Sequence, residues 1–193
     1  MEDVNKWKAF RQGDQEAFQE IFRQYIRLLY KYGSRFTPDA ALVEDAIQDL
    51  FLYLWQKRST LGDTDNVKFY LMAALRRNII QKLRKVNSSH SVDAENYHFE
   101  LEFNIEELMI RDEVQQSQTT GLQEAVNNLS ARQKEVVYLK YYKQLSYEEV
   151  GAAMNINYQS VRNLLHNALK ALKEHIHLIK VLVCLASWVG LPF

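Results

Sequence analysis

Apolar residues recur at the spacing of α-helices in two stretches of the chain, 43–56 and 158–173. With about 3.6 residues per turn, residues three or four positions apart share one face of a helix. In the first stretch that face carries Val43, Ile47, Leu50, Phe51 and Leu54. In the second it carries Val161, Leu165, Ala168 and Leu172. Both stretches are therefore predicted to be amphipathic helices that bury one face in a core.

Two helix starts precede the second stretch. Serine is followed three residues later by Gln or Glu at Ser130–Gln133 and at Ser146–Glu149, which is the pattern of a capping box. Asn155 suits the left-handed conformation of a tight turn, and Asn157 is a candidate cap for the helix that follows. A short helix, a tight turn and a second helix with an apolar back together predict a helix-turn-helix.

The outer face of the 158–173 helix is polar and carries no acid. Amides pair with adenine, guanidinium groups pair with guanine, and lysine contacts phosphate. The predicted DNA-binding residues are Tyr158, Gln159, Ser160, Arg162, Asn163, His166 and Lys170. An ordinary helical hairpin with a polar outer face is the alternative interpretation. The caps, the turn and the absence of acids favour the DNA-reading one.

The outer face of the 43–56 helix mixes carboxylates with large apolar side chains. It carries Asp45, Gln48, Asp49, Leu52 and Trp55. A solvated face seldom combines Trp and Leu with paired acids, whereas a surface that binds another protein often does. The alternative is that Trp55 folds back into the core. The pattern predicts a protein-binding surface.

Composition and charge fit helices that bind nucleic acid. The chain has only 6 Gly and 2 Pro in 193 residues, which favours long helices over strands and tight turns. Its net charge is zero, but the charges are segregated along the chain. Residues 68–85 and 150–173 contain bases and no acid, and 93–113 contains many acids and one base, Arg111. The two basic segments are candidates for binding a phosphate backbone. The alternative is that they are solvated faces, and the motifs have to decide between the two interpretations.

These patterns divide the chain into an all-α fold of two small domains joined by an acidic linker. The first domain is predicted at 1–86, the linker at 87–103, the helix-turn-helix domain at 104–177 and an apolar tail at 178–193. The polar run Asn87–Ser91 marks the start of the linker. The uncharged end of the tail, 181–193, is shorter than the roughly 20 residues that span a bilayer, so no stable membrane insertion is expected. We expect the tail to pack within the protein or against a regulator.

Several classes of protein are disfavoured. The single cysteine, Cys184, excludes an internal disulfide and a Cys-rich zinc site, and it suits a reducing cytoplasm. The acidic N-terminus lacks the apolar core of a secretion signal. The sequence contains no Gly-rich phosphate loop, zinc-protease motif or nucleophile elbow. We therefore expect a cytoplasmic protein that is not an enzyme and needs no metal or cofactor.

Four segments together resemble the extracytoplasmic-function sigma factors. Val43–Trp55 resembles that family's polymerase-binding helix, and Gly13–Phe18 resembles the start of the same domain. Phe69–Leu71 followed by Arg76–Asn78 resembles the helix that engages the downstream promoter element. Leu129–Leu172 resembles the second domain. The resemblance covers most of residues 5–174, with the domains in the family's order.

The resemblance implies a transcription initiation factor. Its partners would be core RNA polymerase, through the β′ and β subunits, promoter DNA and, as a candidate, an anti-sigma factor. The 43–56 face would bind β′, and the 158–173 helix would read the upstream element. The loop 59–67 would capture a base flipped from the downstream element. The residues implied there are Asn66, Lys68, Tyr70, Arg76 and Arg77. A helix-turn-helix regulator that acts without binding polymerase is the alternative.

Overall fold

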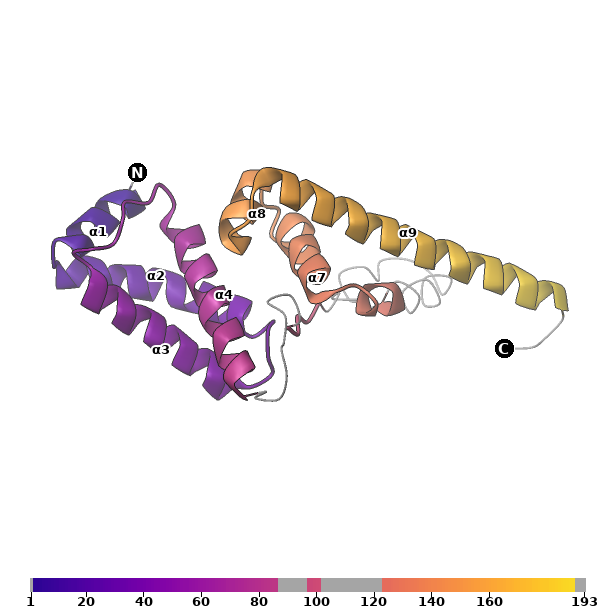
Figure 1. Cartoon of the computed structure of the whole chain (residues 1–193), viewed down its shortest axis with the longest axis horizontal. Coiled ribbons are helices and arrows are strands. Elements are labelled where there is room, and N and C mark those ends of the chain that lie inside the picture. Colours follow the sequence, from indigo (N-terminus) through magenta and orange to yellow (C-terminus); the bar gives the residue numbers. More distant parts are fainter. Residues whose placement is uncertain (1, 87–96, 102–122, 190–193) are drawn as a thin grey trace.

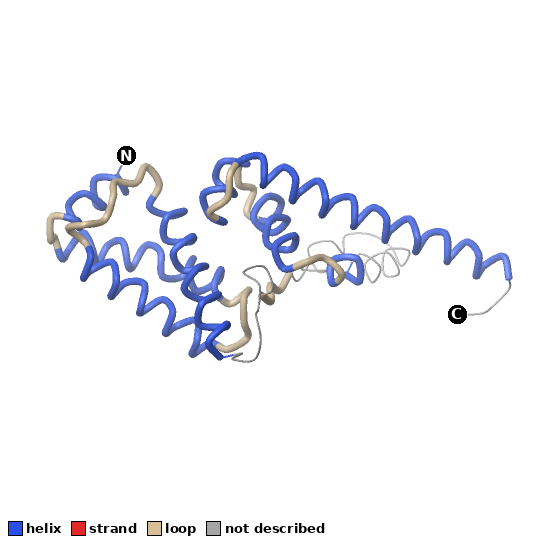
Figure 2. Tube along the Cα trace, in the orientation of Figure 1, coloured by secondary structure: helices blue, strands red, loops and turns tan. Residues whose placement is uncertain are grey.

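The described part of the chain consists of helices joined by loops and contains no strand (Figures 1 and 2). A computed structural model describes residues 2–86, 97–101 and 123–189, with side chains as far as Glu174 in the last range. The first domain contains α1 (Glu2–Arg11), α2 (Gln15–Gly33), α3 (Ala40–Lys57) and α4 (Val67–Val86). The second contains α7 (Ala131–Val137), the π-helix η1 (Tyr138–Tyr142), α8 (Tyr147–Met154) and α9 (Tyr158–Val189). The predicted all-α fold class is confirmed.

The first domain is a bundle in which α2, α3 and α4 pack on one another, with α1 across one end. Gly13 has φ +102°, a left-handed conformation that a glycine adopts without strain. The next residue, Asp14, caps α2 by accepting hydrogen bonds from the backbone of Glu16 and Ala17. The apolar stripe predicted on α3 is buried, from Val43 to Leu54. That burial turns the opposite face of α3 outward.

The second domain has the predicted helix-turn-helix. Both capping boxes form. The side chains of Ser130 and Ser146 each accept a backbone N–H, and the backbone N–H of each serine donates in return to the side chain of Gln133 or Glu149. Asn155 ends α8 in the left-handed conformation, with φ 56° and ψ 48°. Asn157 then caps α9, its side-chain oxygen accepting the backbone N–H of Ser160 at 2.8 Å. These local signals place α8 and α9 where the sequence indicated.

Helix α9 is longer than the sequence suggested. It runs without a break to Val189, so the boundary expected at residue 177 falls inside one helix, which extends away from the first domain (Figure 1). The side chains of the predicted apolar tail, 178–193, lie outside the described residues. Among the described helices, none combines the length and apolar character needed to cross a bilayer.

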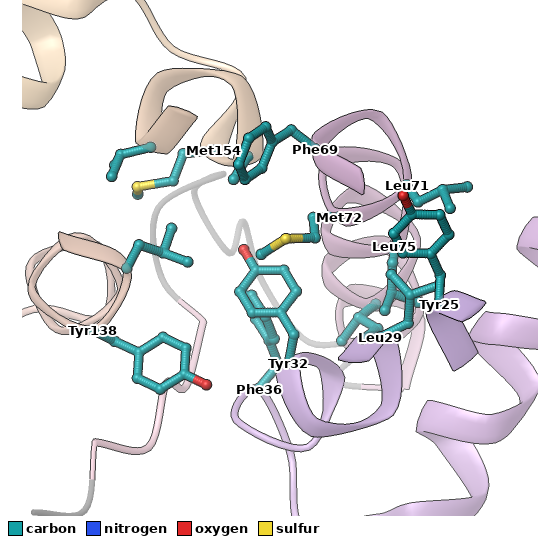
Figure 3. Packing of buried hydrophobic residues seen from close by; sticks show 14 of the residues in the cluster. Tyr25, Leu29, Tyr32, Phe36, Phe69, Leu71, Met72, Leu75, Tyr138 and Met154 are labelled. Atoms are coloured by element: carbon teal, nitrogen blue, oxygen red, sulfur yellow. The ribbon is translucent and has the colours of Figure 1, made fainter. Parts of the chain in front are cut away.

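The two domains share one core. Residues 97–101, within the predicted linker, are described, and Tyr97, Phe99 and Leu101 among them are buried. The backbone N–H of Glu100 donates to the carbonyl of Arg35 at 2.7 Å. The rest of the predicted linker and the segment 104–122 lie outside the described residues. Figure 3 shows Met154 of α8 beside Phe69 of α4 in the apolar contact between the domains.

Candidate nucleic-acid and partner interfaces

The outer face of α9 presents the predicted base-reading side chains to solvent. Its apolar back is buried at Val161, Leu165 and Ala168. The exposed residues on the other side are Tyr158, Gln159, Arg162, Asn163, His166 and Lys170, and Ser160 is half-buried. The amide of Gln159 donates to that of Asn163 at 2.9 Å, which aligns two groups of the type that reads adenine. All of the predicted DNA-binding residues on α9 except the half-buried Ser160 are therefore accessible on its outer face.

A close backbone approach fixes the angle between α8 and α9. Gly151 lies in α8, and a Cβ built there would lie 2.8 Å from the carbonyl oxygen of Ile156. The backbone N–H of Ile156 donates to the carbonyl of Gly151 at 2.9 Å. Only a residue without a side chain fits this contact. The sequence signal for it was a glycine inside a short predicted helix.

The outer face of α3 lies beside an apolar groove of about 520 Å³ between α2 and α3. The groove is lined by Gln15, Phe18, Gln19, Phe22, Gln48, Phe51, Leu52 and Trp55. Leu52 is 58% exposed and Phe22 is 38% exposed, both high values for large apolar side chains. Three of the five predicted polymerase-binding residues, Gln48, Leu52 and Trp55, belong to this groove.

Trp55 is both a groove residue and part of the packing. It is half-buried, with its ring centroid 5.1 Å from that of Phe18 and 6.5 Å from that of Phe10. The guanidinium of Arg58 lies 4.6 Å from the Trp55 ring and donates to the Trp55 carbonyl at 2.7 Å. Trp55 is thus partly packed against the core, as the alternative interpretation predicted, and partly accessible in the groove.

Asp45 and Asp49 lie apart from the groove lining. Both pair with Lys82 of α4, Asp49 at 2.6 Å, and the two carboxylates raise the pKa of that lysine. The acid side chains remain about half exposed or more, at 61% and 49%. The predicted protein-binding face is therefore an apolar groove and a separate acidic patch on the same helix.

The residues implied for the downstream element divide between two hollows. Asn66, Tyr70, Arg76 and Arg77 line a cleft of about 670 Å³ between α4 and α8, together with Arg84. Lys68 instead lines a groove of about 310 Å³ that also reaches Tyr138 of the second domain. Four of the five residues thus share one basic cleft.

Two of these residues also have local structural contacts. Asn66 caps α4 by accepting the backbone N–H of Phe69 at 3.3 Å. The Tyr70 ring packs edge-on against Trp7 with centroids 5.0 Å apart, and burial raises the pKa of its hydroxyl. Phe69 itself is buried in the contact with α8 and is core.

Arg76 is held by Glu135 of the second domain. Its Nε donates to the two carboxylate oxygens at 2.9 and 3.1 Å, and its Nη2 donates to the Tyr97 hydroxyl at 2.9 Å. Burial lowers the pKa of Arg76, but the Glu135 carboxylate and the neighbouring tyrosines outweigh it, so the pKa is raised. Burial, reinforced by the charge of Glu135, raises the pKa of Tyr32 and Tyr97.

Sequence reasoning did not single out Glu135. A signal existed, because Ala131 and Leu139 lie four residues to either side of it on one helical stripe. An acid on an apolar stripe is a candidate for a buried, paired charge. Among the described residues, no group of three or more His, Cys, Asp or Glu side chains is arranged to hold a metal ion.

Comparison with known proteins identifies both domains. The chain matches the model of sigma-70 region 2 over residues 21–89 and that of sigma-70 region 4 over residues 120–172. It is similar to the ECF RNA polymerase sigma factor SigL of Mycobacterium tuberculosis, with 27% identity over 155 residues, covering 79% of this chain and 85% of SigL. SigX of Bacillus subtilis is 21% identical over 168 residues, covering 86% and 87% of the two chains.

Solved structures share the fold. CnrH, in complex with the cytosolic domain of CnrY, superposes with a TM-score of 0.57 at 16% identity, covering 89% of this chain and 95% of CnrH. The sigma factor RpoE of Bartonella quintana, in complex with the anti-sigma factor NepR, gives a TM-score of 0.54 at 18% identity, covering 83% and 96%.

The fold and the exposed face of α9 define a two-domain, helix-turn-helix DNA-binding protein. With both sigma-70 regions present in order, the chain belongs to the extracytoplasmic-function sigma factors, which direct core RNA polymerase to promoters.

Proposed function

We propose that this sigma factor binds core polymerase mainly through the groove between α2 and α3. The observation that carries the proposal is Leu52, which stands 58% exposed at the edge of an apolar hollow of about 520 Å³. An exposed leucine beside such a groove fits an amphipathic helix of a partner, which would cover it. The coiled coil of the polymerase β′ subunit is a partner of that kind.

Asp45 and Asp49 supply the polar border of the same interface. Their carboxylates are exposed enough to pair with basic side chains of β′. In the free protein both carboxylates pair with Lys82. Border charges of this type mainly raise the association rate and set orientation. The groove supplies the affinity.

Promoter DNA is bound at two places. The outer face of α9 reads the upstream element in the major groove, with Arg162 and Asn163 at its centre. Asn66, Tyr70, Arg76 and Arg77 bind the melted downstream strand, because cations beside an aromatic ring fit a single strand whose bases stack and whose phosphates need counter-charge. Lys68 contacts the flanking phosphates.

The groove is tested by replacing Leu52 with alanine and measuring binding to core polymerase. Tyr53 is a matched control, since it is 53% exposed on the same helix but does not line the groove. Loss of a central apolar contact costs about 2 kcal/mol or more, so Leu52→Ala should weaken binding by roughly thirtyfold. Tyr53→Ala should weaken it by less than about threefold. Equal losses in the two variants would refute the groove as the binding site.

A further inference from the structure

The contact between the two domains contains a fully buried carboxylate, that of Glu135 in α7. It accepts hydrogen bonds from the Tyr32 hydroxyl at 2.5 Å, from Nε of Arg76 and from the Tyr97 hydroxyl. These donors belong to α2, to α4 and to residues 97–101. Every one of them lies outside the helix-turn-helix domain, so the group joins the two halves of the molecule.

A buried ion pair of this kind sets geometry more than it adds stability. Removing Glu135 and Arg76 from water costs much of what their attraction returns. When the domains separate, both charges are hydrated again. The apolar contacts around the pair, such as Phe69 against Met154 (Figure 3), favour closure without making it permanent. The pair thus fixes the register of the junction, while the apolar contacts supply most of its stability.

When the domains are in contact, Glu135 and Tyr97 bind the guanidinium of Arg76, which the proposed function assigns to nucleic-acid binding. The side chain of Arg76 is 15% exposed, with its Nε bonded to Glu135 and its Nη2 bonded to Tyr97. The opposite wall of the cleft beside it is formed by Ala152, Met154, Asn155 and Ile156 at the end of α8. The second domain therefore forms one wall of the cleft that a strand would have to enter to reach Arg76.

We propose that this closed arrangement is an autoinhibited state, in which the Glu135 carboxylate occupies Arg76 in the place of a DNA phosphate. Binding of the melted strand requires α8 to leave α4 and the Glu135–Arg76 pair to exchange partners. This inference rests on the proposed role of the α4 cleft in binding single-stranded DNA.

The first test opens the junction with Glu135→Gln in the full chain. The amide matches the carboxylate in shape but lacks its charge, so Arg76 loses its counter-ion and the closed-to-open ratio falls, on the order of a hundredfold. Glu148→Gln is the matched control, because Glu148 is an exposed acid on α8. Small-angle X-ray scattering measures the radius of gyration, and fluorescence anisotropy measures affinity for a mixed-sequence single-stranded oligonucleotide.

The expected result is an increase in both quantities for Glu135→Gln alone. Affinity should rise about tenfold if one molecule in ten is open in the parent, since apparent affinity scales with the competent fraction. An unchanged radius of gyration in a folded Glu135→Gln protein would refute the claim that the Glu135–Arg76 pair holds the domains together. An increased radius of gyration with unchanged affinity would refute the claim that the closed state blocks DNA binding. If neither the parent nor the opened variant binds the oligonucleotide, the proposed function of the cleft fails instead.

A second test holds the junction closed. Ala73 of α4 and Ala152 of α8 line opposite walls of the cleft, and both are small. In a Cys184→Ser background, Ala73→Cys and Ala152→Cys are joined by a bismaleimide linker. The joined protein should lose oligonucleotide binding, whereas the singly substituted, maleimide-capped proteins should retain it. Full binding by the joined protein would contradict autoinhibition.

Discussion

Gly151 offers a test in which two physical effects predict opposite signs. Alanine is the better helix former by about 1 kcal/mol, so propensity alone makes Gly151→Ala stabilising. The structure instead places the new Cβ 2.8 Å from the carbonyl oxygen of Ile156, a backbone atom that also belongs to the turn. Overpacking of this kind costs roughly 1–3 kcal/mol, because the turn has to shift. The clash outweighs propensity, and we expect a net loss of about 1 kcal/mol.

The assay is thermal unfolding followed by circular dichroism. A loss of about 1 kcal/mol lowers the Tm by roughly 2–4 °C in a chain of this size. Ala152→Gly is the control, since Ala152 is an exposed residue of the same helix and the change lowers helix propensity and removes one methyl group from the cleft wall. It should also destabilise, by about 1 kcal/mol. Because the shifted turn re-aims α9, Gly151→Ala should weaken duplex binding as well. A Gly151→Ala protein that is more stable than the parent would refute the close approach.

Two further predictions concern DNA contacts and tyrosine ionisation. Arg162→Ala should reduce the preference for one base pair of the upstream element by about 1–3 kcal/mol. Lys170→Ala should instead weaken binding to all sequences and reduce by about 1 the slope of log affinity against log salt concentration. Competition binding at several salt concentrations distinguishes the two variants, and identical behaviour would contradict the base-reading role of Arg162. Burial, reinforced by Asp3 or Glu135, raises the pKa of Tyr25, Tyr32 and Tyr97 above the ordinary 10.0. Their contribution to stability is complete below pH 10 and is lost as the pH rises toward the folded pKa values. Tyrosinate absorbance should therefore show these groups ionising only with unfolding, and a single transition near pH 10 for all 11 tyrosines of the folded chain would be the opposing result.

The helix-turn-helix was predictable because its signals are local. Ser130, Ser146 and Asn155 act on backbone groups within four residues, and the α9 stripe requires only helical geometry. The features that the sequence did not indicate depend on the contact between domains. The apolar stripe around Glu135 indicates a buried acid, but its partners come from α2, α4 and residues 97–101, which helical spacing within α7 cannot identify. Residues 97–101 were predicted only as part of the linker, and the burial of Tyr97, Phe99 and Leu101 likewise depends on tertiary packing.

The predicted protein-binding face of α3 also shows what helical periodicity cannot predict. Periodicity placed Asp45, Gln48, Asp49, Leu52 and Trp55 on one side of α3 but could not indicate what flanks that side. Phe18 and Phe22 of α2 complete the groove, and Lys82 of α4 takes the acids. Helical spacing therefore identified the helix face, and tertiary packing divided it into two patches.

The central claim is that one chain joins core polymerase to two promoter elements. Its most direct test is transcription of a genomic DNA library by core polymerase with and without the protein, followed by sequencing of the transcript 5′ ends. The account predicts new start sites that share two motifs at a fixed spacing, and their loss with Leu52→Ala. Start sites identical to those of core polymerase alone would contradict it.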